Sequence, residues 1–410
     1  MLRWLIPILL FSIIEFYSFQ AVRTATRSKW ILFGYILTSV VFIAYLIYYI
    51  SSHSRNDAQS HVFQWTIGIF LLIYLPKIIL TLVLFSEDVF RFFAGLFGYI
   101  SNSDSTEKFL PERRKFISQV ALGLAAIPFT SLIYGMTKGK YNFKVIKQTL
   151  FFPDLPDSFD GTTITHISDI HSGSFDDKEK IEYAIDLINE QQSDLVLFTG
   201  DIVNTKATEM HPWVDTFKRI HNPVLGKFSV LGNHDYGEYF RWDSQAEKEQ
   251  NFNDIKDLHR QINFNLLMNE NVEIKKGNDS IRLIGVENWG VKFKKAGDLK
   301  LASAGIAKKD FKILMSHDPS HWDAEVQHDD NHYHLTLSGH THGFQFGIEI
   351  PGWIKWSPVQ YVYKQWAGLY ENVGRYIYVN RGFGFHAYPG RVGIMPEITV
   401  IELKKGEKVV

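Results

Sequence analysis

The 410-residue chain contains no cysteine, and its positive and negative side chains almost balance. Without cysteine there is no disulfide framework and no thiolate metal site, so a metal would have to be held by His, Asp, Glu or Asn. Lys and Arg number 43, and Asp and Glu number 44. This balance leaves no excess of basic residues to bind a phosphate backbone. We therefore expect no specific nucleic-acid partner, and the chain length predicts two or three domains.

Charged residues are also scarce in the first third of the chain, which is rich in apolar and aromatic residues. A helix that spans a bilayer needs about 20 predominantly apolar residues. Four stretches meet this requirement: 2–22, 30–50, 64–85 and 117–136. The apolar stretch 89–100 is shorter, which indicates an interfacial segment. We predict a multi-pass membrane domain over residues 1–140, in contact with the lipid bilayer, and a soluble domain over residues 141–410.

The basic residues in the short loops predict the orientation of these spans, because loops rich in Lys and Arg usually stay in the cytoplasm. Arg23, Arg27 and Lys29 lie in the first loop, whereas Arg55 is alone in the second. The third loop carries several more basic residues. This distribution places both termini and the soluble domain outside the cytoplasm. Four lysines that follow the last span, at positions 138, 140, 144 and 147, favour the opposite orientation.

Two features of the membrane domain have both a functional and a structural explanation. The segment 112–118, ERRKFIS, resembles a twin-arginine export signal in its two arginines and its phenylalanine, but it equally fits the basic flank of a membrane helix. Glu15 and Lys77 are ionisable residues inside predicted spans, and such residues often have a function. For these two residues we favour a position near a helix end or an ion pair between helices.

Beyond residue 141 the sequence alternates between strand-like and helix-like segments, which is typical of an α/β domain. One predicted helix carries Ile181, Ala184, Ile185 and Ile188 on a single face. Five apolar runs are predicted strands, and polar side chains follow each run directly. They are Asp169 and His171, Asp201, Asn233 and His234, His317, and His340 and His342. Because ligands bind beyond the carboxyl ends of strands in α/β sheets, we expect these side chains to face one site.

The chemistry of these side chains indicates a metal site. Carboxylate, imidazole and amide donors together suit Mn, Fe or Zn better than Ca or a thiophilic ion. So many donors exceed one tetrahedral site, but they fit two metal ions about 3.5–4 Å apart that share a carboxylate, as in phosphatases and nucleases. Such a pair can hold both oxygens of an in-line displacement, and it lowers the pKa of a bound water until hydroxide is available near neutral pH.

The order of the motifs is more specific than any one of them. Along the chain they read D-x-H at 169–171, G-D at 200–201, G-N-H-D at 232–235, a single His317, and G-H-x-H at 339–342. This order resembles the calcineurin-like metallophosphoesterase superfamily. The ending VNRGFGFHAYPGRVGIMPEITVIEL, residues 379–403, is similar to its membrane-attached bacterial branch. The combination with several spans is also similar to the transmembrane metallophosphoesterase-domain proteins. The resemblance covers roughly residues 145–405.

The resemblance implies a four-layer α/β/β/α sandwich and two divalent metal ions. One metal would be held by Asp169, His171 and His342, the other by Asn233, His317 and His340, and Asp201 would bridge them. His234 would not bind metal. Oriented by Asp235, it would hydrogen-bond a phosphate oxygen or protonate the leaving alkoxide. The implied activity is hydrolysis of phosphodiester or phosphomonoester bonds by a hydroxide between the two metals.

The remaining histidines and two arginines match no motif position. We expect loop or surface roles for His321, His328, His332 and His334. His166 is unassigned, and His386 could line the cleft because it lies in the glycine-rich stretch 381–391. Arg381 and Arg391 either contact phosphate oxygens as bidentate donors or form ordinary ion pairs, and we favour the ion pairs.

The substrate hypothesis depends on the aromatic residues. The stretch 351–370 is dense in Trp and Tyr, and Trp289 and Phe293 add to it. These rings either cover strands of the domain or form a rim at the bilayer, where Trp and Tyr favour the interface. The rim favours a lipid-linked phosphoester as the substrate.

Two other classes of function compete with an enzyme. A catalytically inactive membrane receptor or scaffold on the same fold would usually have lost a ligand or the histidine of G-N-H-D, and here none is lost. A transporter with a regulatory soluble domain has little support, since the spans contain only two internal charges, Glu15 and Lys77.

Overall fold

The computed structural model describes residues 2–52, 60–100, 111–350 and 352–407. The chain forms two compact units, and each is described by itself. The helical unit comprises residues 2–52, 66–100 and 111–134, and the α/β unit comprises residues 60–65, 135–350 and 352–407.

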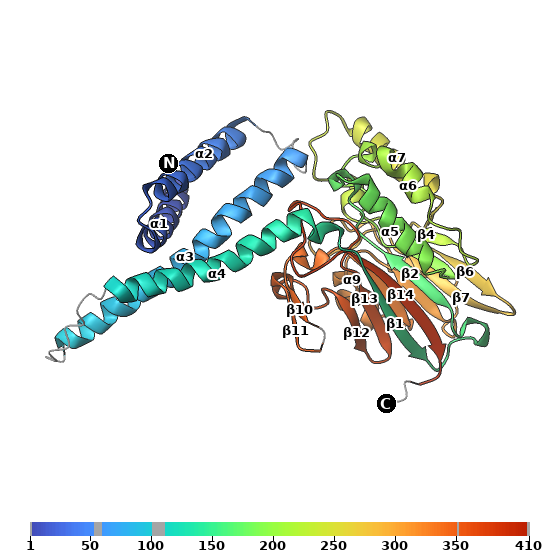
Figure 1. Cartoon of the computed structure of the whole chain (residues 1–410). Helices are drawn as coiled ribbons and strands as arrows, with labels where there is room; N and C mark the ends of the chain where they lie inside the picture. The colour runs from blue at the N-terminus through green and yellow to red at the C-terminus, as the bar shows by residue number, and fades with distance from the viewer. Residues whose placement is uncertain (1, 53–59, 101–110, 351, 408–410) are drawn as a thin grey trace. The chain divides into compact units, whose positions relative to one another are not determined.

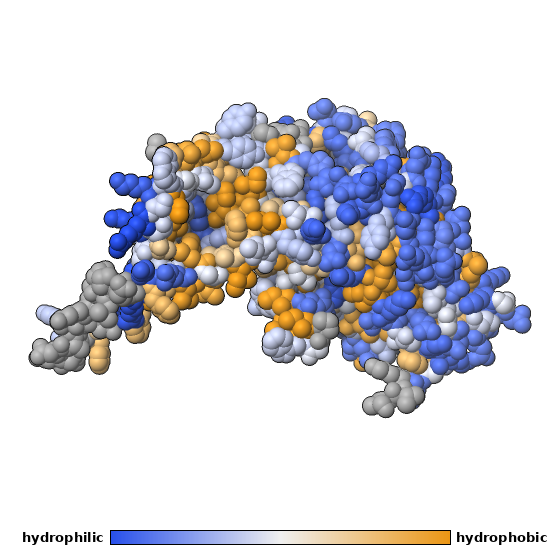
Figure 2. All heavy atoms as spheres, viewed as in Figure 1, coloured by the Kyte–Doolittle hydropathy of each residue, from blue (hydrophilic) through white to orange (hydrophobic). Residues whose placement is uncertain are grey.

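Four long helices make up the membrane region (Figure 1). They are α1 Leu2–Ala25, α2 Lys29–Ser52, α3 His61–Ile100 and α4 Pro111–Thr137. All four are long and apolar enough to cross a membrane, and apolar residues gather over them in Figure 2. The four predicted spans lie within these helices. The stretch 89–100, which we expected as a short interfacial segment, is instead the last part of the 40-residue helix α3.

Polar residues of the helical unit are paired between helices. Lys77 on α3 forms an ion pair with Glu15 on α1 at 2.8 Å, so the predicted interhelical pair is confirmed. Tyr74 and Tyr35 also donate to the Glu15 carboxylate, at 3.0 and 3.2 Å. Arg114 on α4 pairs with two acidic residues of α3. These contacts satisfy charged groups that would be costly to leave unpaired in an apolar environment.

Two six-stranded sheets form the centre of the α/β unit (Figure 1). The first has the order β1-β14-β2-β3-β4-β5, with β2 to β5 parallel. Its strands are β1 Lys144–Phe152, β14 Glu397–Lys405, β2 Thr163–Ile167, β3 Leu195–Phe198, β4 Lys227–Ser229 and β5 Asn265–Leu266.

The second sheet has the order β12-β13-β9-β8-β7-β6, with β7, β8, β9 and β13 parallel. Its strands are β12 Gly368–Asn372, β13 Arg375–Val379, β9 Leu335–Ser338, β8 Lys312–Met315, β7 Asp279–Gly285 and β6 Glu270–Lys276. A separate antiparallel pair consists of β10 Ile348–Ile350 and β11 Ile354–Trp356.

Successive residues of a strand point to opposite faces, and β3 shows how this builds the layers. Leu195 and Leu197 belong to the core between the two sheets, together with Ile313 of the second sheet. Val196 and Phe198 face a different core, which lies under the helices of the first sheet. All four side chains of β3 are buried, as expected for a strand covered on both faces.

Helices cover the outer face of each sheet. On the first sheet these are α5 Lys178–Glu190, α6 Val214–Lys218 and α7 Gln245–Gln261. On the second sheet they are α8 Leu299–Ala302 and α9 Ser320–Ala324. The side chain of Asp177 caps α5 by accepting from the backbone of Lys180, and the predicted apolar face of α5 is fully buried. The predicted four-layer α/β/β/α sandwich is therefore confirmed.

Short 3-10 helices fill many connections. They are η2 Gly139–Tyr141, η3 Asp157–Phe159, η4 Ser172–Ser174, η5 Ala207–Glu209, η6 His211–Trp213, η7 His234–Tyr236, η8 Val326–His328, η9 His342–Gln345 and η10 Pro358–Tyr361. Two of them carry residues of the site: His234 lies in η7 and His342 lies in η9, while η4 begins directly after His171.

Candidate metal centre

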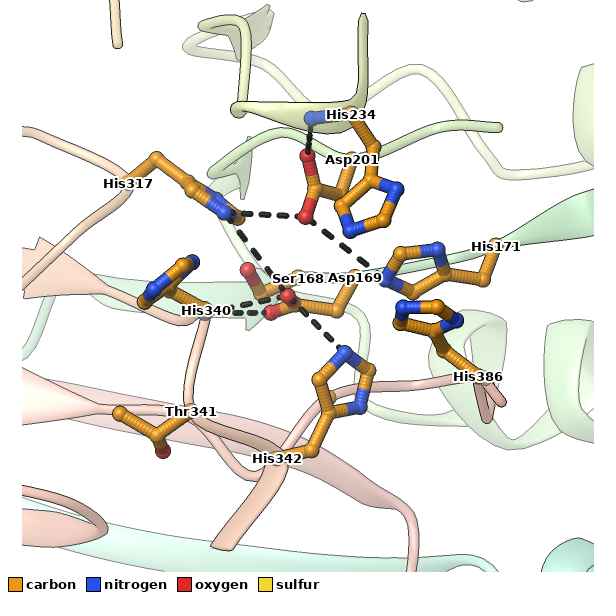
Figure 3. Close-up of polar contacts among 12 residues, drawn as sticks. Ser168, Asp169, His171, Asp201, His234, His317, His340, Thr341, His342 and His386 are labelled. Atoms are coloured by element: carbon orange, nitrogen blue, oxygen red, sulfur yellow. Dashed lines mark hydrogen bonds and ion pairs between the residues drawn. The ribbon is translucent and has the colours of Figure 1, made fainter. Parts of the chain in front are cut away.

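The polar side chains that follow five strands lie together (Figure 3). They come from the loops after β2, β3 and β4 of the first sheet and after β8 and β9 of the second. Asp169 Oδ1 lies 3.2 Å from His342 Nε2. Asp201 Oδ2 lies 3.1 Å from His317 Nε2 and 3.6 Å from His171 Nε2. The carboxyl ends of strands from both sheets therefore supply one site, as the sequence predicts.

Three groups of side chains in the described part of the chain could each hold a metal ion, with ligand atoms within 4.8 Å of one another. They are Asp169, His171 and His342; Asp201, His317 and His340; and His171, Asp201 and His234. Asp201 belongs to two of these groups and so lies between them. Asn233 is next to His340, whose ring nitrogen Nδ1 is 2.8 Å from the Asn233 Oδ1. The structure thus brings together all seven residues for which the sequence predicts a metal role.

The ring nitrogens at the centre of the site fit a metal. The Nε2 atoms of His171, His317 and His342 are buried and have no hydrogen-bond partner among the residues that the structure describes. Buried polar atoms are rarely left without a partner, and a coordinated ion is one explanation for such exceptions. All three atoms lie within 4 Å of a carboxylate oxygen, which is the donor set that a divalent transition metal requires.

Contacts at the opposite ring nitrogens fix the orientation of these histidines. His317 Nδ1 lies 2.6 Å from the Thr199 carbonyl oxygen, and His171 Nδ1 lies 3.0 Å from Asn204 Oδ1. Such contacts set the tautomer that leaves Nε2 free for a metal. His342 differs, because its Nδ1 lies 3.2 Å from the Arg391 guanidinium. Metal binding through Nε2 requires a proton on this Nδ1, so the contact with Arg391 would then have to open.

The backbone of the site is in an unusual conformation. Five of the seven residues have a positive φ between 48° and 70°: Asp169, His171, Asp201, His340 and His342. Residues other than glycine rarely adopt this region, and each instance costs on the order of 1–3 kcal/mol. This concentration at one site indicates that the loops are held in place to present their side chains.

Two motif glycines are required by the packing of the carboxylates. A Cβ at Gly232 would lie 2.2 Å from Asp201 Oδ1, and a Cβ at Gly339 would lie 2.2 Å from Asp169 Oδ2. Both distances are far shorter than any real contact of a Cβ. The glycines of G-N-H-D and G-H-x-H therefore give the Asp201 and Asp169 side chains room to enter the site.

The charges at the site favour metal binding. Burial alone raises the pKa of Asp169 and Asp201, but the facing histidines outweigh it and lower both pKa values. Burial and neighbouring histidines lower the pKa of His171 well below its ordinary value. Ionised carboxylates and neutral imidazoles are the forms that bind metals. Burial opposes charge on His317 too, but Asp201 and Asp169 raise its pKa to about 10, so a metal would displace its proton.

The Asp235 carboxylate has no contact with the His234 ring, which we expected it to orient. His234 Nδ1 lies 2.8 Å from the Asn204 carbonyl oxygen. The Asp235 carboxylate instead accepts the backbone N–H groups of Asp201, Ile202 and Gly232 at 2.8–2.9 Å. Asp235 follows His234 at the start of the 3-10 helix η7, so the two side chains point in different directions. Asp235 holds two loops of the site together, and it does not orient the His234 ring.

His386 lines the site, whereas the two arginines do not face it as phosphate donors. The His386 ring stacks on His171 with ring centroids 4.9 Å apart and lies 4.6 Å from His234 (Figure 3). Arg381 pairs with Glu349 and Glu397. Arg391 is fully buried and donates to the carbonyl groups of its own glycine-rich loop. The favoured structural role of Arg381 is confirmed, and Arg391 binds backbone rather than a carboxylate.

The other unassigned histidines have structural partners. His166 contacts Thr199, His321 contacts Ser316, and His334 contacts Asp154, with distances of 2.9, 2.8 and 2.7 Å. His166, His321 and His334 are buried. The expected loop or surface role fits His328, which is exposed, and His332 and His334, which lie in a loop, but not His321, which lies in α9.

Three further residues lie at the site that we did not predict from the sequence. Asn204 contacts both His171 and His234. The Tyr239 hydroxyl lies 2.7 Å from Asn233 Nδ2, and the Tyr363 hydroxyl lies 2.8 Å from His340 Nε2. Asn204 lies three residues after the G-D motif, which is the one signal in the sequence that could have identified it.

Comparison with known proteins agrees with this geometry. The family profile "Calcineurin-like phosphoesterase" matches residues 162–344, and the profile "Probable Calcineurin-like phosphoesterase, transmembrane domain" matches residues 2–140. The chain is 30% identical over 303 residues to the uncharacterized metallophosphoesterase YkuE of Bacillus subtilis, which covers 71% of this chain and 97% of the relative.

Two further relatives link the α/β unit and the helices to the same family. Phosphodiesterase YaeI of Escherichia coli is 29% identical over 299 residues, or 71% of this chain and 98% of the relative. A transmembrane protein with metallophosphoesterase domain from Danio rerio is 25% identical over 333 residues, or 77% of this chain and 71% of the relative. The chain is therefore a membrane protein of the calcineurin-like metallophosphoesterase family and a metal-dependent phosphoester hydrolase.

Proposed function

We propose that the protein is a membrane-anchored phosphoesterase that uses two divalent metal ions to hydrolyse phosphodiester or phosphomonoester bonds. The observation that carries this proposal is the place of the Asp201 carboxylate, which lies 3.6 Å from His171 and 3.1 Å from His317, one histidine of each proposed set of ligands. Two such ions, when bound, polarise the phosphoester and lower the pKa of water.

The proposed ligands form two sets, one for each metal ion. Asp169, His171 and His342 would hold one ion, and Asn233, His317 and His340 would hold the other. Asp201 would be shared between them. The buried and oriented rings of His171 and His317 keep their Nε2 atoms turned inward. Such preorganised ligands need little rearrangement when the metals and the substrate bind.

His234 is suited to act on the substrate. Its Nδ1 is engaged with the Asn204 carbonyl oxygen, so Nδ1 carries the proton and Nε2 is left for another partner. Once this Nε2 takes up a second proton, it would donate a hydrogen bond to a phosphate oxygen or transfer that proton to the leaving oxygen. His386 lies beside His234 and His171 and forms part of the wall that the substrate meets.

A lipid-linked substrate is supported by exposed aromatic residues in a stretch of the chain that reaches the site through Tyr363. Trp353 is 77% exposed and Tyr361 is 78% exposed. Two residues beyond Tyr361, the hydroxyl of Tyr363 contacts the site residue His340. Large exposed apolar groups in one segment often mark a membrane or partner surface. The distribution of basic loop residues further supports an extracytoplasmic α/β unit.

The activity is tested with the full chain in detergent, using chromogenic phosphodiesters and phosphomonoesters. Chelation should abolish hydrolysis, and Mn, Fe or Zn should restore it. Persistent hydrolysis after complete metal removal would contradict the proposal. A second assay compares lipid-linked phosphoesters in vesicles with water-soluble ones. Trp353→Ala with Tyr361→Ala should slow only the vesicle reaction, and an equal effect on both substrates would exclude a lipid-facing rim.

A further inference from the structure

The helical unit contains a pocket of about 520 Å³ at the turn that joins α1 to α2. Its apolar wall includes Val22 and Ala25 of α1, Ile31 and Gly34 of α2, and Leu122 of α4. Such a wall favours hydrocarbon over water. Because all four helices are long and apolar enough to cross a membrane, the hydrocarbon available to fill the pocket is the acyl chain of a lipid.

Lys77 is the one charged residue in this wall among the described residues, and its charge is already satisfied. Its ammonium donates to both oxygens of Glu15, at 2.8 and 2.9 Å, and to Ser39 Oγ at 2.7 Å. An ammonium has three protons, so Lys77 has no donor left for a phosphate. The interior of the pocket therefore suits an uncharged chain, and a charged head group has to lie outside it.

The other polar residues of the wall are also bonded within the protein. Thr38 and Ser39 donate to backbone carbonyls one turn earlier, Tyr35 donates to Glu15, and Thr26 accepts from the backbone of Ser28. These bonds leave few groups that would recognise a polar ligand, which again indicates a hydrocarbon occupant.

Basic residues surround the turn beside the pocket. Arg23, Arg27 and Lys29 are exposed, and none forms an ion pair with a residue that the structure describes. The chain has no acidic residue between positions 16 and 56. Trp30 follows directly and is 83% exposed, as is common for Trp at a membrane interface. Clusters of Lys and Arg at the end of membrane helices attract anionic lipid head groups.

We propose that this pocket and turn form a binding site for an anionic phospholipid, with an acyl chain in the pocket and the phosphate against Arg23, Arg27 and Lys29. The site lies entirely within the helical unit and does not depend on the function proposed for the metal centre. The bound lipid would connect α1, α2 and α4 and stabilise their packing.

A substitution at Gly34 tests whether the acyl chain of the lipid occupies the pocket. A Cβ built on Gly34 meets nothing within 4 Å, so Gly34→Leu places a side chain in the pocket without disturbing its neighbours. Leucine also favours a helix more than glycine does. Gly123→Leu on α4 is the matched control, because Gly123 is exposed, its Cβ also meets nothing within 4 Å, and it does not line the pocket.

The experiment is native mass spectrometry of the full chain with phosphatidylglycerol and phosphatidylcholine of identical chains. Wild type and Gly123→Leu should retain phosphatidylglycerol preferentially. Gly34→Leu should bind both lipids about tenfold or more weakly, since each excluded methylene removes about fourfold in affinity. Arg27→Gln should weaken the binding of phosphatidylglycerol by about fivefold and leave the binding of phosphatidylcholine unchanged. Equal retention of both lipids by wild type, undiminished binding by Gly34→Leu, or a protein partner in place of lipid would overturn the proposal.

Discussion

Asp201 and His317 lie 3.1 Å apart although they follow strands of different sheets, β3 of the first and β8 of the second. Both side chains are buried. Their proximity shows that the two sheets are joined at the metal centre, where their carboxyl ends meet. Because the proposed ligands lie on five loops of two sheets, each loop can be disturbed separately.

Replacing His234 should slow hydrolysis without emptying the centre. His234→Ala removes a ring that the seven proposed ligands do not need for metal binding, so the metal content should stay at the wild-type level. The rate should fall about 100- to 10,000-fold, which is the usual contribution of a general acid or base. Hydrolysis rate and metal content measured on the same sample test this, with His328→Ala as an exposed control. Loss of metal together with activity would instead make His234 a ligand.

Asn204 should act as a positioning residue. Its side chain contacts His171 Nδ1, while the contact with His234 comes from its backbone. Asn204→Ala should therefore loosen His171 and weaken metal binding about 10- to 100-fold, as is usual for groups that orient a metal ligand, with little change in the His234 contact. A metal titration measures this directly. Unchanged metal affinity would show that the packing of His171 alone is sufficient.

Gly339 should tolerate no side chain. In Gly339→Ala the new Cβ would lie 1.9 Å from Ser168 Oγ and 2.2 Å from Asp169 Oδ2. Overpacking of this kind destabilises a protein by about 1–3 kcal/mol, and displacement of Asp169 should also lower the metal content. Thermal unfolding compares this variant with Gly123→Ala, whose Cβ meets nothing within 4 Å. Equal melting temperatures would mean that the G-H-x-H loop is less tightly packed than the structure shows.

His259 should make the protein less stable in acid. It is fully buried and contacts Ser229 Oγ at 2.8 Å. Burial lowers its pKa from 6.5 to about 3. The unfolded chain therefore binds a proton that the folded protein excludes, and stability is lost as the pH falls from about 6.5 towards 3. The glutamine of His259→Gln cannot bind a proton in the unfolded chain. The melting temperature of this variant should therefore fall less steeply than that of wild type over this pH range. Parallel curves would exclude His259 as a contributor.

The positions of polar side chains after apolar strands predicted that these side chains cluster, because the ends of parallel strands meet at one edge of a sheet. The family that the motif order resembles implied the set of metal ligands and the four-layer fold. The contacts of Asp235 could not be predicted, since spacing along the chain does not tell whether a carboxylate faces a ring or the backbone of another loop. Tyr239 and Tyr363 come from loops that only tertiary packing brings to the site, whereas the glycine-rich stretch around His386 did indicate its place there. The length of α3 was also missed, because composition alone does not show that a helix continues past a charged pair such as Glu87 and Asp88.

Metal analysis of the purified full chain can show whether two metal ions share Asp201. We expect two metal equivalents per wild-type chain and one or fewer for Asp201→Asn, with hydrolysis lost in parallel. Asp215→Asn, which changes a 98% exposed side chain, should retain the wild-type content. Two tightly bound metals and normal hydrolysis in Asp201→Asn would show that Asp201 does not bridge two metal ions.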